Sequence, residues 1–248
     1  MNRGQAIITG ALGGLGTAMT EKLCAMGIPV IATDRRAEDF EPWRQALPAA
    51  MRDQVSFYPL DVTREEPVNQ LAATLAARKI DVAYLINNAG IQGPGKPWEM
   101  ETKTWMRVMN VNITGTFHMT RAFSEQMVNR GFGRIVNLAS LAAYQPMRNQ
   151  GPYSAAKAAV TGYTRSTALD LARHGVTVNV IAPGLIMHPR LADVDTGTNF
   201  DTMATGIPMG RTGRPEEIGA TVAFLCSEGA SYITGQTIHV NGGWYLPG

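Results

Sequence analysis

The residues best suited to chemistry lie between Ser140 and Lys157. Tyr153 and Lys157 are four residues apart at the start of a segment with helical apolar spacing, so their side chains are expected to share one helix face. A phenol titrates near ~10, and a neighbouring cation lowers that pKa. Such a tyrosine could give a proton to a carbonyl oxygen or take one from an alcohol. Ser140, at the end of an apolar run, could hydrogen-bond the same oxygen. Because Tyr and Lys one turn apart also occur on solvated helix faces, this spacing needs support from the rest of the chain.

That support begins with a glycine-rich segment, residues 9–16, TGALGGLG. It follows an apolar run and precedes a helical pattern. Glycines let the backbone turn tightly and approach a pyrophosphate, which a helix N-terminus attracts. The spacing differs from the general dinucleotide fingerprint G-x-G-x-x-G, but its place between strand and helix favours a nucleotide site over a plain turn.

Asp34 ends the second apolar run, where a carboxylate could accept hydrogen bonds from the adenosine ribose and would repel a 2′-phosphate. Arg35 and Arg36 follow and could instead bind that phosphate or be solvated. We weigh Asp34 more heavily and expect NAD, with NADP possible.

Polar residues follow the next two apolar runs. Asp61-Val62 could contact the nucleotide, although Asp61 could also cap the following helix. The segment 87–90, NNAG, could likewise be a binding loop or a turn. Both segments are expected at the carboxyl ends of strands, where doubly wound sheets bind ligands.

Short β-rich runs alternate with longer helical patterns along the whole chain. Nearly all-apolar, β-branched runs indicate a parallel sheet buried on both faces. We therefore predict an α/β fold, a single-domain Rossmann-type doubly wound parallel sheet of about seven strands with helices on both faces, spanning 1–248. The predicted strands are 5–9, 29–33, 55–60, 82–87, 134–139, 176–182 and 236–240, and the predicted helices are 14–26, 38–47, 64–79, 103–129, 152–173 and 215–226.

Composition excludes several other classes. The chain has 248 residues, 45% of them apolar and 17% charged, which suits a globular protein with a buried core. Its formal charge of +2 gives no reason to expect nucleic acid or an anionic membrane as partner. Two cysteines and four histidines show no metal-ligand spacing, so no metal is expected. With no signal-peptide pattern and no apolar run of membrane-spanning length, we expect a cytoplasmic protein.

Together these motifs resemble the short-chain dehydrogenase/reductase family over essentially the whole sequence. The pattern is most similar to tetrameric reductases of 3-oxoacyl thioesters and related secondary-alcohol dehydrogenases. The elements that carry the resemblance are Thr9-Gly10, Gly14, Gly16, Asp34, Asp61-Val62, Asn87-Asn88-Ala89-Gly90, Asn112, Ser140, Tyr153, Lys157, Pro183-Gly184 and Gly235-Gln236 with Asn241-Gly242-Gly243.

The resemblance implies an oxidoreductase that moves a hydride between a nicotinamide cofactor and a secondary alcohol or ketone. Tyr153 would be the general acid/base, Ser140 would orient the carbonyl, and Lys157 would lower the tyrosine pKa and hold a ribose. Asn112 would hold a water for proton relay; Asn110 competes for this role, but the spacing to Phe117 selects Asn112.

The resemblance also implies cofactor and substrate contacts. The predicted cofactor contacts are Gly10, Leu12, Gly14, Leu15, Gly16, Asp34, Arg35, Asp61, Val62, Asn88, Ala89, Gly90, Tyr153, Lys157, Pro183, Gly184, Ile186 and His188. The predicted substrate contacts are Ser140, Ala142, Gln150 and Tyr153. A substrate loop is predicted at about 188–211, because a long aperiodic segment in a compact domain usually serves binding. Arg148 could meet an anionic substrate group or be solvated.

Two positions depart from the family pattern. His188 stands where many relatives have a threonine that touches the cofactor, and it could donate a similar hydrogen bond, contact substrate or face solvent. Asn241 stands where aspartate is frequent, and we interpret it as a structural substitution. The aromatic ending, with Trp244 and Tyr245, and the two long helices predict interfaces of a homotetramer.

Two other functions remain open. A catalytically silent NAD(P)-binding regulatory or scaffold protein could keep this fold. Such proteins usually lose a member of the catalytic set, and none is missing here. An enzyme using tightly held NAD for epimerisation or dehydration commonly has a larger C-terminal domain than this chain offers.

Overall fold

The computed structural model describes residues 3–145, 147–188 and 200–247, with the side chains of Phe200 and Asp201 left out. A seven-stranded, all-parallel sheet forms its centre, in the order β3-β2-β1-β4-β5-β6-β7. The predicted sheet is confirmed, and each strand lies within a residue of its expected bounds. The strands are β1 Gln5–Thr9, β2 Val30–Asp34, β3 Val55–Pro59, β4 Val82–Asn87, β5 Gly133–Leu138, β6 Val176–Pro183 and β7 Thr237–Val240.

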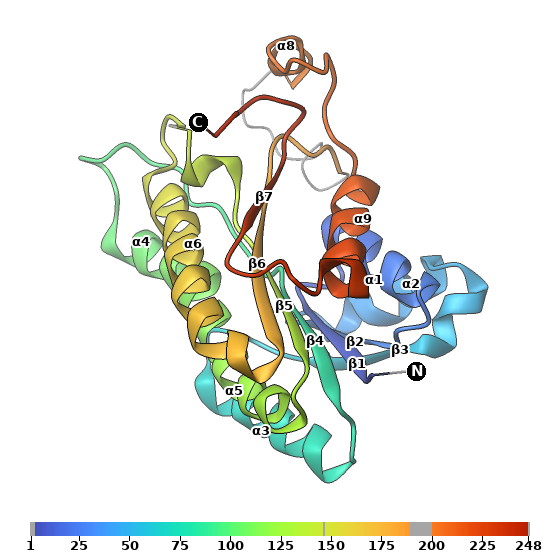
Figure 1. Cartoon of the computed structure of the whole chain (residues 1–248). Coiled ribbons are helices and arrows are strands. Elements are labelled where there is room, and N and C mark those ends of the chain that lie inside the picture. The colour runs from blue at the N-terminus through green and yellow to red at the C-terminus, as the bar shows by residue number, and fades with distance from the viewer. Residues whose placement is uncertain (1–2, 146, 189–199, 248) are drawn as a thin grey trace.

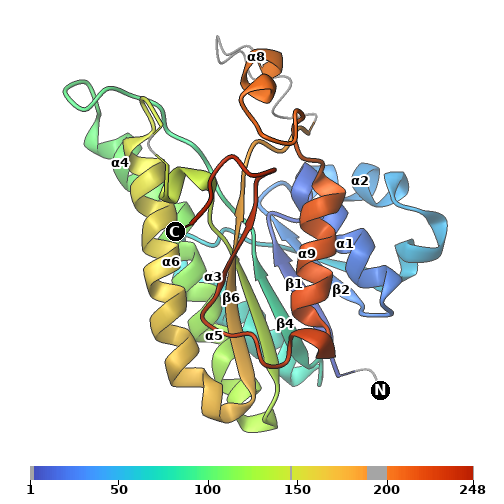
Figure 2. The same ribbon diagram turned by 45° about the horizontal axis from the view of Figure 1, so that its top comes forward.

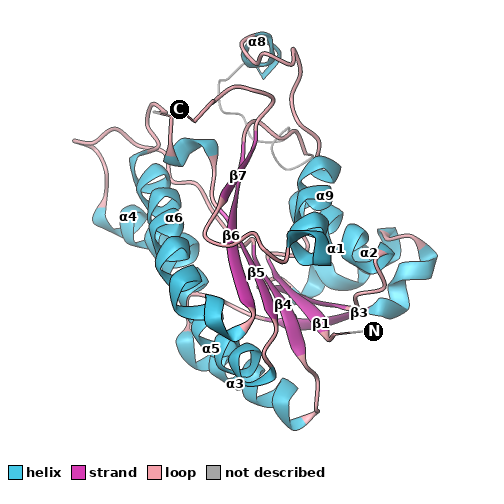
Figure 3. Cartoon of the chain, viewed as in Figure 1, coloured by secondary structure: helices cyan, strands magenta, loops and turns pink. Residues whose placement is uncertain are grey.

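Helices cover both faces of the sheet, as Figures 1 and 3 show. One group contains α1, α2 and α9; the other contains α3, α4, α5 and α6. The helices are α1 Gly14–Ala25, α2 Phe40–Ala46, α3 Glu65–Ala77, α4 Thr102–Met109, α5 Gly115–Arg130, α6 Gly151–Leu171, α8 Phe200–Thr205 and α9 Pro215–Cys226.

Side chains that alternate between the two faces of the sheet contribute to two separate hydrophobic cores. In β1, Ile8 packs with Met19 of α1 and Ile218 of α9, whereas its neighbour Ile7 packs with Phe123 of α5 on the other face. Successive strand residues point to opposite faces, so a strand buried on both sides needs apolar residues at every position. This explains the unbroken apolar runs in the sequence.

The predicted helix at 103–129 is wrong in one respect, because it is not one continuous α-helix. A π-helical turn at Asn110–Thr114 separates α4 from α5. Within it, Asn112 Nδ2 donates to the carbonyls of Val108 and Ile91, both at 2.9 Å. An asparagine that bonds nearby carbonyls competes with regular helix geometry. Asn112 is buried in this turn, between α4 and α5.

A buried amide network fixes α6 against the sheet. Asn87 Nδ2 of β4 donates to Asn137 Oδ1 of β5 at 2.8 Å, and Asn137 Nδ2 donates to Thr164 Oγ1 of α6 at 2.8 Å. Buried polar groups of this kind are costly unless paired, and once paired they specify position. The network therefore sets the register of the helix that carries Tyr153 and Lys157.

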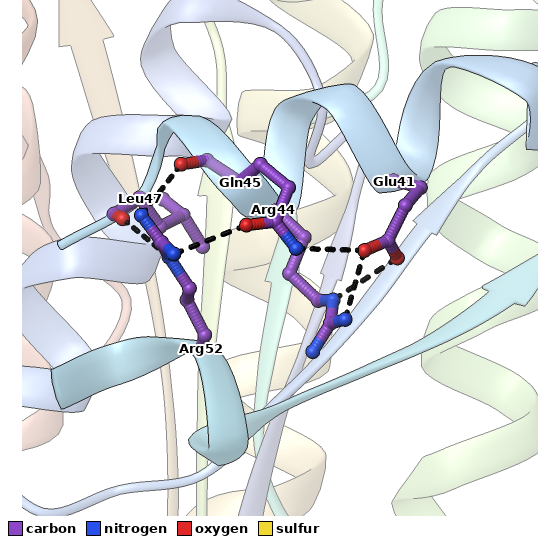
Figure 4. Close-up of polar contacts among 5 residues, drawn as sticks. All are labelled: Glu41, Arg44, Gln45, Leu47 and Arg52. Carbon is purple, nitrogen blue, oxygen red and sulfur yellow. Dashed lines mark hydrogen bonds and ion pairs between the residues drawn. The ribbon is translucent and has the colours of Figure 1, made fainter. Parts of the chain in front are cut away.

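The end of α2 is held by a cluster of polar contacts (Figure 4). The Arg52 guanidinium donates to the carbonyls of Leu47 and Gln45 at 3.0 and 2.8 Å, and Arg44 pairs with Glu41 at 2.8 Å. These bonds satisfy carbonyls that a helix C-terminus leaves unpaired. They steady the connection between β2 and β3.

Beyond the carboxyl ends of β6 and β7, the chain forms the short helix α8 (Figures 1 and 2). This helix lies within the predicted loop at about 188–211, for which no helix was expected. Residues 189–199 of that loop lie outside the described residues.

Candidate active site

The glycine-rich turn after β1 is tied directly to the segment after β4. The Thr9 hydroxyl accepts hydrogen bonds from the backbone N–H groups of Asn88 and Ala89 at 3.0 and 2.9 Å. Asn88 Nδ2 donates back to the carbonyls of Thr9 and Gly10 at 2.9 and 3.0 Å. β1 and β4 flank the point where the strand order reverses, which is where doubly wound sheets bind ligands.

A cavity of about 310 Å³ opens at this point. Its lining comes from the ends of β1, β2, β3 and β4 and from the π-helical turn, with His188 beyond β6. The lining residues are Gly10, Gly13, Gly14, Leu15, Gly16, Asp34, Arg35, Arg36, Leu60, Asp61, Val62, Asn88, Ala89, Gly90, Ile91, Val111 and His188.

The glycines of this cavity fit a dinucleotide cofactor, because side chains at their positions would collide with the backbone or close the site. Gly10 has a φ of +63°, which L side chains rarely adopt, and a Cβ there would lie 3.1 Å from Ala89 Cα. A Cβ at Gly16 would lie 2.5 Å from the Ala11 carbonyl oxygen. Gly14 begins α1, whose first turn contains no acidic residue. The free N–H groups of a helix start suit a diphosphate.

Carboxylates lie after the second and third strands of the same cavity. Asp34 is 3.7 Å from the Arg36 guanidinium, which also pairs with Asp39 at 2.8 Å. Asp61 Oδ1 accepts hydrogen bonds from the Thr63 N–H at 3.0 Å and hydroxyl at 2.7 Å. Asp61 therefore closes its own turn and also lines the cavity, but it does not cap α3, whose N-cap is Arg64 without a side-chain hydrogen bond.

The predicted catalytic side chains meet around the start of α6. Lys157 is buried, and its ammonium donates to the Leu138 carbonyl at 2.7 Å and lies 5.7 Å from the centre of the Tyr153 ring. The Ser140 side chain hydrogen-bonds Tyr153, and the Ala142 N–H donates to Ser140 Oγ at 3.2 Å. The backbone thereby orients the serine toward the phenol.

Burial perturbs both titratable groups. Burial raises the pKa of Tyr153, and the hydrogen bond with Ser140 opposes that rise. Burial also lowers the pKa of Lys157 to about 8. Each shift disfavours the charged form. A lysine poised near neutral pH beside a tyrosine is suited to proton transfer.

Asn112 and Gly90 complete this group. Asn112 Oδ1 is buried and has no hydrogen-bond partner among the described residues. A Cβ at Gly90 would lie 2.8 Å from that oxygen and 3.3 Å from Lys157 Nζ. The absence of a side chain at Gly90 thus leaves space where Asn112 and Lys157 converge. A water there could accept from the lysine and donate to the amide oxygen.

Several predicted contacts do not line the cavity. Leu12 is buried. Gly184 packs against Asn241, because a Cβ there would lie 2.8 Å from Asn241 Cα. Ile186 lines a second cavity of about 470 Å³ beside the C-terminal segment. Pro183 ends β6 and pairs with Val240 of β7. Tyr153 and Lys157 are not part of the lining either; Lys157 is buried, with its Nζ close to Gly90.

The predicted substrate contacts have partners of their own. Ala142 is buried and acts through its N–H on Ser140. Gln150 precedes α6, and its Nε2 donates to Gln92 Oε1 at 3.5 Å. The side-chain amides of Gln150 and Gln92 therefore lie together, and Gln150 is three residues before Tyr153 in the sequence. Asn241 Oδ1 accepts from the Gly243 N–H at 2.9 Å, in keeping with the structural role expected for it.

Five lining residues are absent from the predicted contacts: Gly13, Arg36, Leu60, Ile91 and Val111. Each adjoins a motif that the sequence did reveal. These residues line the cavity because the backbone on either side of a motif runs along it. In the sequence, the only sign of their role is that they are next to a motif residue.

Comparison with known proteins identifies the family. Residues 10–245 match the family model described as enoyl-(acyl carrier protein) reductase. The chain belongs to the short-chain dehydrogenase/reductase family. It is similar to 3-oxoacyl-[acyl-carrier-protein] reductase FabG of Haemophilus influenzae, with 36% identity over 241 residues covering 97% of this chain and 98% of the relative. Acetoacetyl-CoA reductase of Allochromatium vinosum is 34% identical over 243 residues, covering 97% and 98%.

A solved structure from Agrobacterium tumefaciens, assigned as a gluconate dehydrogenase, superposes with a TM-score of 0.92 at 32% identity, covering 98% of this chain and 96% of that one. Membership makes this chain an oxidoreductase, and the family uses NAD(P). Within the described part of the chain, no cluster of metal ligands is present, and no helix is long and apolar enough to cross a membrane.

Proposed function

We propose that this protein interconverts a secondary alcohol and a ketone with NAD as the preferred cofactor, and that Tyr153 is the general acid/base. The observation that carries the proposal is the convergence of Ser140, Tyr153, Lys157 and Asn112 beside a glycine-lined cavity.

In the proposed reaction, the bound cofactor supplies or accepts the hydride. Tyr153 gives its phenolic proton to the substrate oxygen during reduction and removes the hydroxyl proton during oxidation. Ser140, already hydrogen-bonded to Tyr153, orients the same oxygen and stabilises its developing charge. Lys157 holds the nicotinamide ribose and favours the phenolate through its charge.

Protons reach Tyr153 by way of Lys157 and a water molecule that Asn112 holds. The lysine has a pKa of about 8 and exchanges protons readily near neutral pH. The unpartnered Asn112 Oδ1 would hold a water beside the lysine, at the opening left by Gly90. This arrangement would connect the phenol to solvent without moving a helix.

The preference for NAD rests on Asp34. Its carboxylate lines the adenosine end of the cavity, where it would accept hydrogen bonds from ribose hydroxyls and repel a 2′-phosphate. The neighbouring Arg36 guanidinium is engaged by Asp34 and Asp39. Gly13 stands where NADP-using relatives often carry a cation, as the family resemblance implies.

We further propose that the protein is a cytoplasmic homotetramer. Exposed apolar side chains lie on α5, α6 and α9, including Phe117, Leu169 and Phe224. Such side chains suit subunit interfaces. Light scattering that gave the monomer mass of 26.7 kDa would refute the assembly.

The substrate panel should follow the relatives' names. We propose 3-oxoacyl thioesters as the first class and sugar acids as the second, because relatives are named as reductases of the former and a gluconate dehydrogenase shares the fold. The test follows nicotinamide absorbance with NADH and NADPH against both classes. Turnover that is faster with NADH supports the proposal. Tight cofactor binding without turnover across the panel would favour a regulatory protein.

A further inference from the structure

His188 lies in the cofactor cavity, in direct contact with the glycine-rich turn. It lines the cavity together with Gly13, Gly14 and Gly16. A Cβ on Gly14 would lie 2.8 Å from His188 Cβ, 3.2 Å from Cγ and 3.5 Å from Nδ1. The imidazole is thus seated against the first residue of α1, where the helix N–H groups open toward a diphosphate.

One nitrogen of this ring lacks a partner. His188 Nδ1 is buried and makes no hydrogen bond to any described residue. A buried polar atom without a partner is costly, and such an atom inside a binding cavity is a place where a ligand supplies the missing bond. Burial also lowers the pKa of His188, so the ring is neutral at neutral pH before a ligand binds.

In the described part of the chain, the charged groups around this cavity make contacts other than with His188. The first turn of α1, which the ring contacts, contributes no carboxylate. After β2 and β3 the cavity holds Asp34, Arg35, Arg36 and Asp61, and Asp34 is paired with Arg36.

Three more charged groups, Arg211, Arg214 and Glu217, come from the segment that pairs with residues 186–187 and from the first turn of α9. Of these, Arg211 pairs with Glu217 at 2.6 Å, and Glu217 also accepts from the Arg214 N–H at 2.8 Å. Among the residues that the structure describes, none pairs with the ring nitrogen Nδ1, so a diphosphate placed at α1 would supply negative charge that stabilises an imidazolium.

We propose that His188 binds the cofactor diphosphate as an imidazolium, so that cofactor binding takes up one proton and its affinity rises as pH falls. The inference rests on the proposed cofactor site and goes beyond it, because the threonine usual at this position in the family could not titrate. The balance is simple: solvent supplies a proton to the neutral ring, and the imidazolium N–H donates to a phosphate oxygen.

The direction follows from linkage. The pKa of His188 is below its ordinary value in the free protein, and an adjacent anion raises it in the complex. Proton uptake occurs between these two pKa values, and affinity is lost as pH rises through the pKa of the complex. A rise of about one unit gives up to a tenfold gain in affinity, and the full gain is reached only at a pH below both pKa values.

The test measures binding without turnover. Calorimetric titrations with ADP-ribose, whose diphosphate does not titrate near neutrality, are run between pH 6 and pH 8 in two buffers of different ionisation enthalpy. Wild type is compared with His188→Gln, which keeps a donor but cannot titrate, and with His174→Gln, which removes an exposed histidine of the turn after α6. Adenosine serves as the ligand without diphosphate, and thermal denaturation checks that each variant is folded.

We expect wild type and His174→Gln to bind ADP-ribose roughly threefold to sixfold more tightly at pH 6 than at pH 8, with net proton uptake. His188→Gln should lose both the uptake and most of the pH dependence, and adenosine binding should be insensitive to His188. Equal pH dependence in wild type and His188→Gln would overturn the proposal while leaving the cofactor site intact. No binding of ADP-ribose at any pH would overturn the cofactor site itself.

Discussion

Replacing Lys157 with methionine removes the positive charge beside Tyr153 while keeping a long apolar side chain. The ammonium lies 5.7 Å from the centre of the tyrosine ring. With the ring centre taken as the position of the phenolate charge, two unit charges at this distance interact by about 3 kcal/mol at an effective dielectric constant of about 20. That energy corresponds to about 2 units in the pKa of the phenol. The lost cation should therefore raise the pKa of Tyr153 by that amount.

The effect should appear in alcohol oxidation, which needs the phenolate. In Lys157→Met the acidic limb of the kcat/KM profile should move upward by about 2 units, and the rate at neutral pH should fall roughly 100-fold. The pKa of Lys157 is about 8, so its charge is present below that pH and lost above it. The difference between wild type and variant should thus be largest below pH 8 and shrink above it.

The assay measures kcat/KM between pH 6 and pH 10 with cofactor held far above its separately measured Kd, because Lys157 is also expected to hold the ribose. Loss of the bond to the Leu138 carbonyl leaves that group unpaired, so Tm is recorded alongside. An acidic limb at the same pH in both proteins, with both folded and saturated, would refute the electrostatic role of the lysine.

Three further changes test other parts of the site. Asp34→Ser should lower the KM for NADPH and raise that for NADH, as measured by steady-state kinetics; unchanged KM values would remove the basis for NAD preference. Gly90→Ala places a methyl group 2.8 Å from Asn112 Oδ1 and 3.3 Å from Lys157 Nζ, and should cut kcat by roughly tenfold or more; Tm is recorded alongside, because the close contact also forces Asn112 or the backbone to shift. A normal kcat would argue against the water between them. Asn137→Ala breaks the buried amide network and should reduce the free energy of unfolding by about 1–3 kcal/mol in urea titrations; a loss below about 0.5 kcal/mol would show that the network contributes little.

The sheet was predictable because its signal is local. Each strand is buried on both faces, so runs such as VAYLIN at 82–87 had to be apolar throughout, and their bounds were found within a residue. The motifs at the strand ends were predictable for a related reason. Glycine at position 10 is dictated by a positive φ and by the approach of Ala89, and this requirement is visible as residue type alone.

The features that sequence reasoning missed depend on contacts between distant segments. In the π-helical turn at Asn110–Thr114, Asn112 donates to the Ile91 carbonyl, twenty-one residues away in sequence, and helical periodicity cannot show that contact. The role of His188 was left open for the same reason, because its contact is with Gly14, a residue far from it in the sequence. Gly184 was expected at the cofactor, but packing against Asn241 of the C-terminal segment accounts for its lack of a side chain.

The most direct test of the account compares Tyr153→Phe with Tyr163→Phe, which removes the hydroxyl of another tyrosine on the same helix. Hydride transfer is followed by nicotinamide absorbance on the best substrate, and cofactor Kd is measured for each variant. The account predicts that Tyr153→Phe loses at least about 100-fold in kcat with cofactor Kd close to that of wild type, while Tyr163→Phe keeps its activity. Substantial turnover by a folded, cofactor-loaded Tyr153→Phe variant would contradict the assignment of this tyrosine as the proton donor and acceptor.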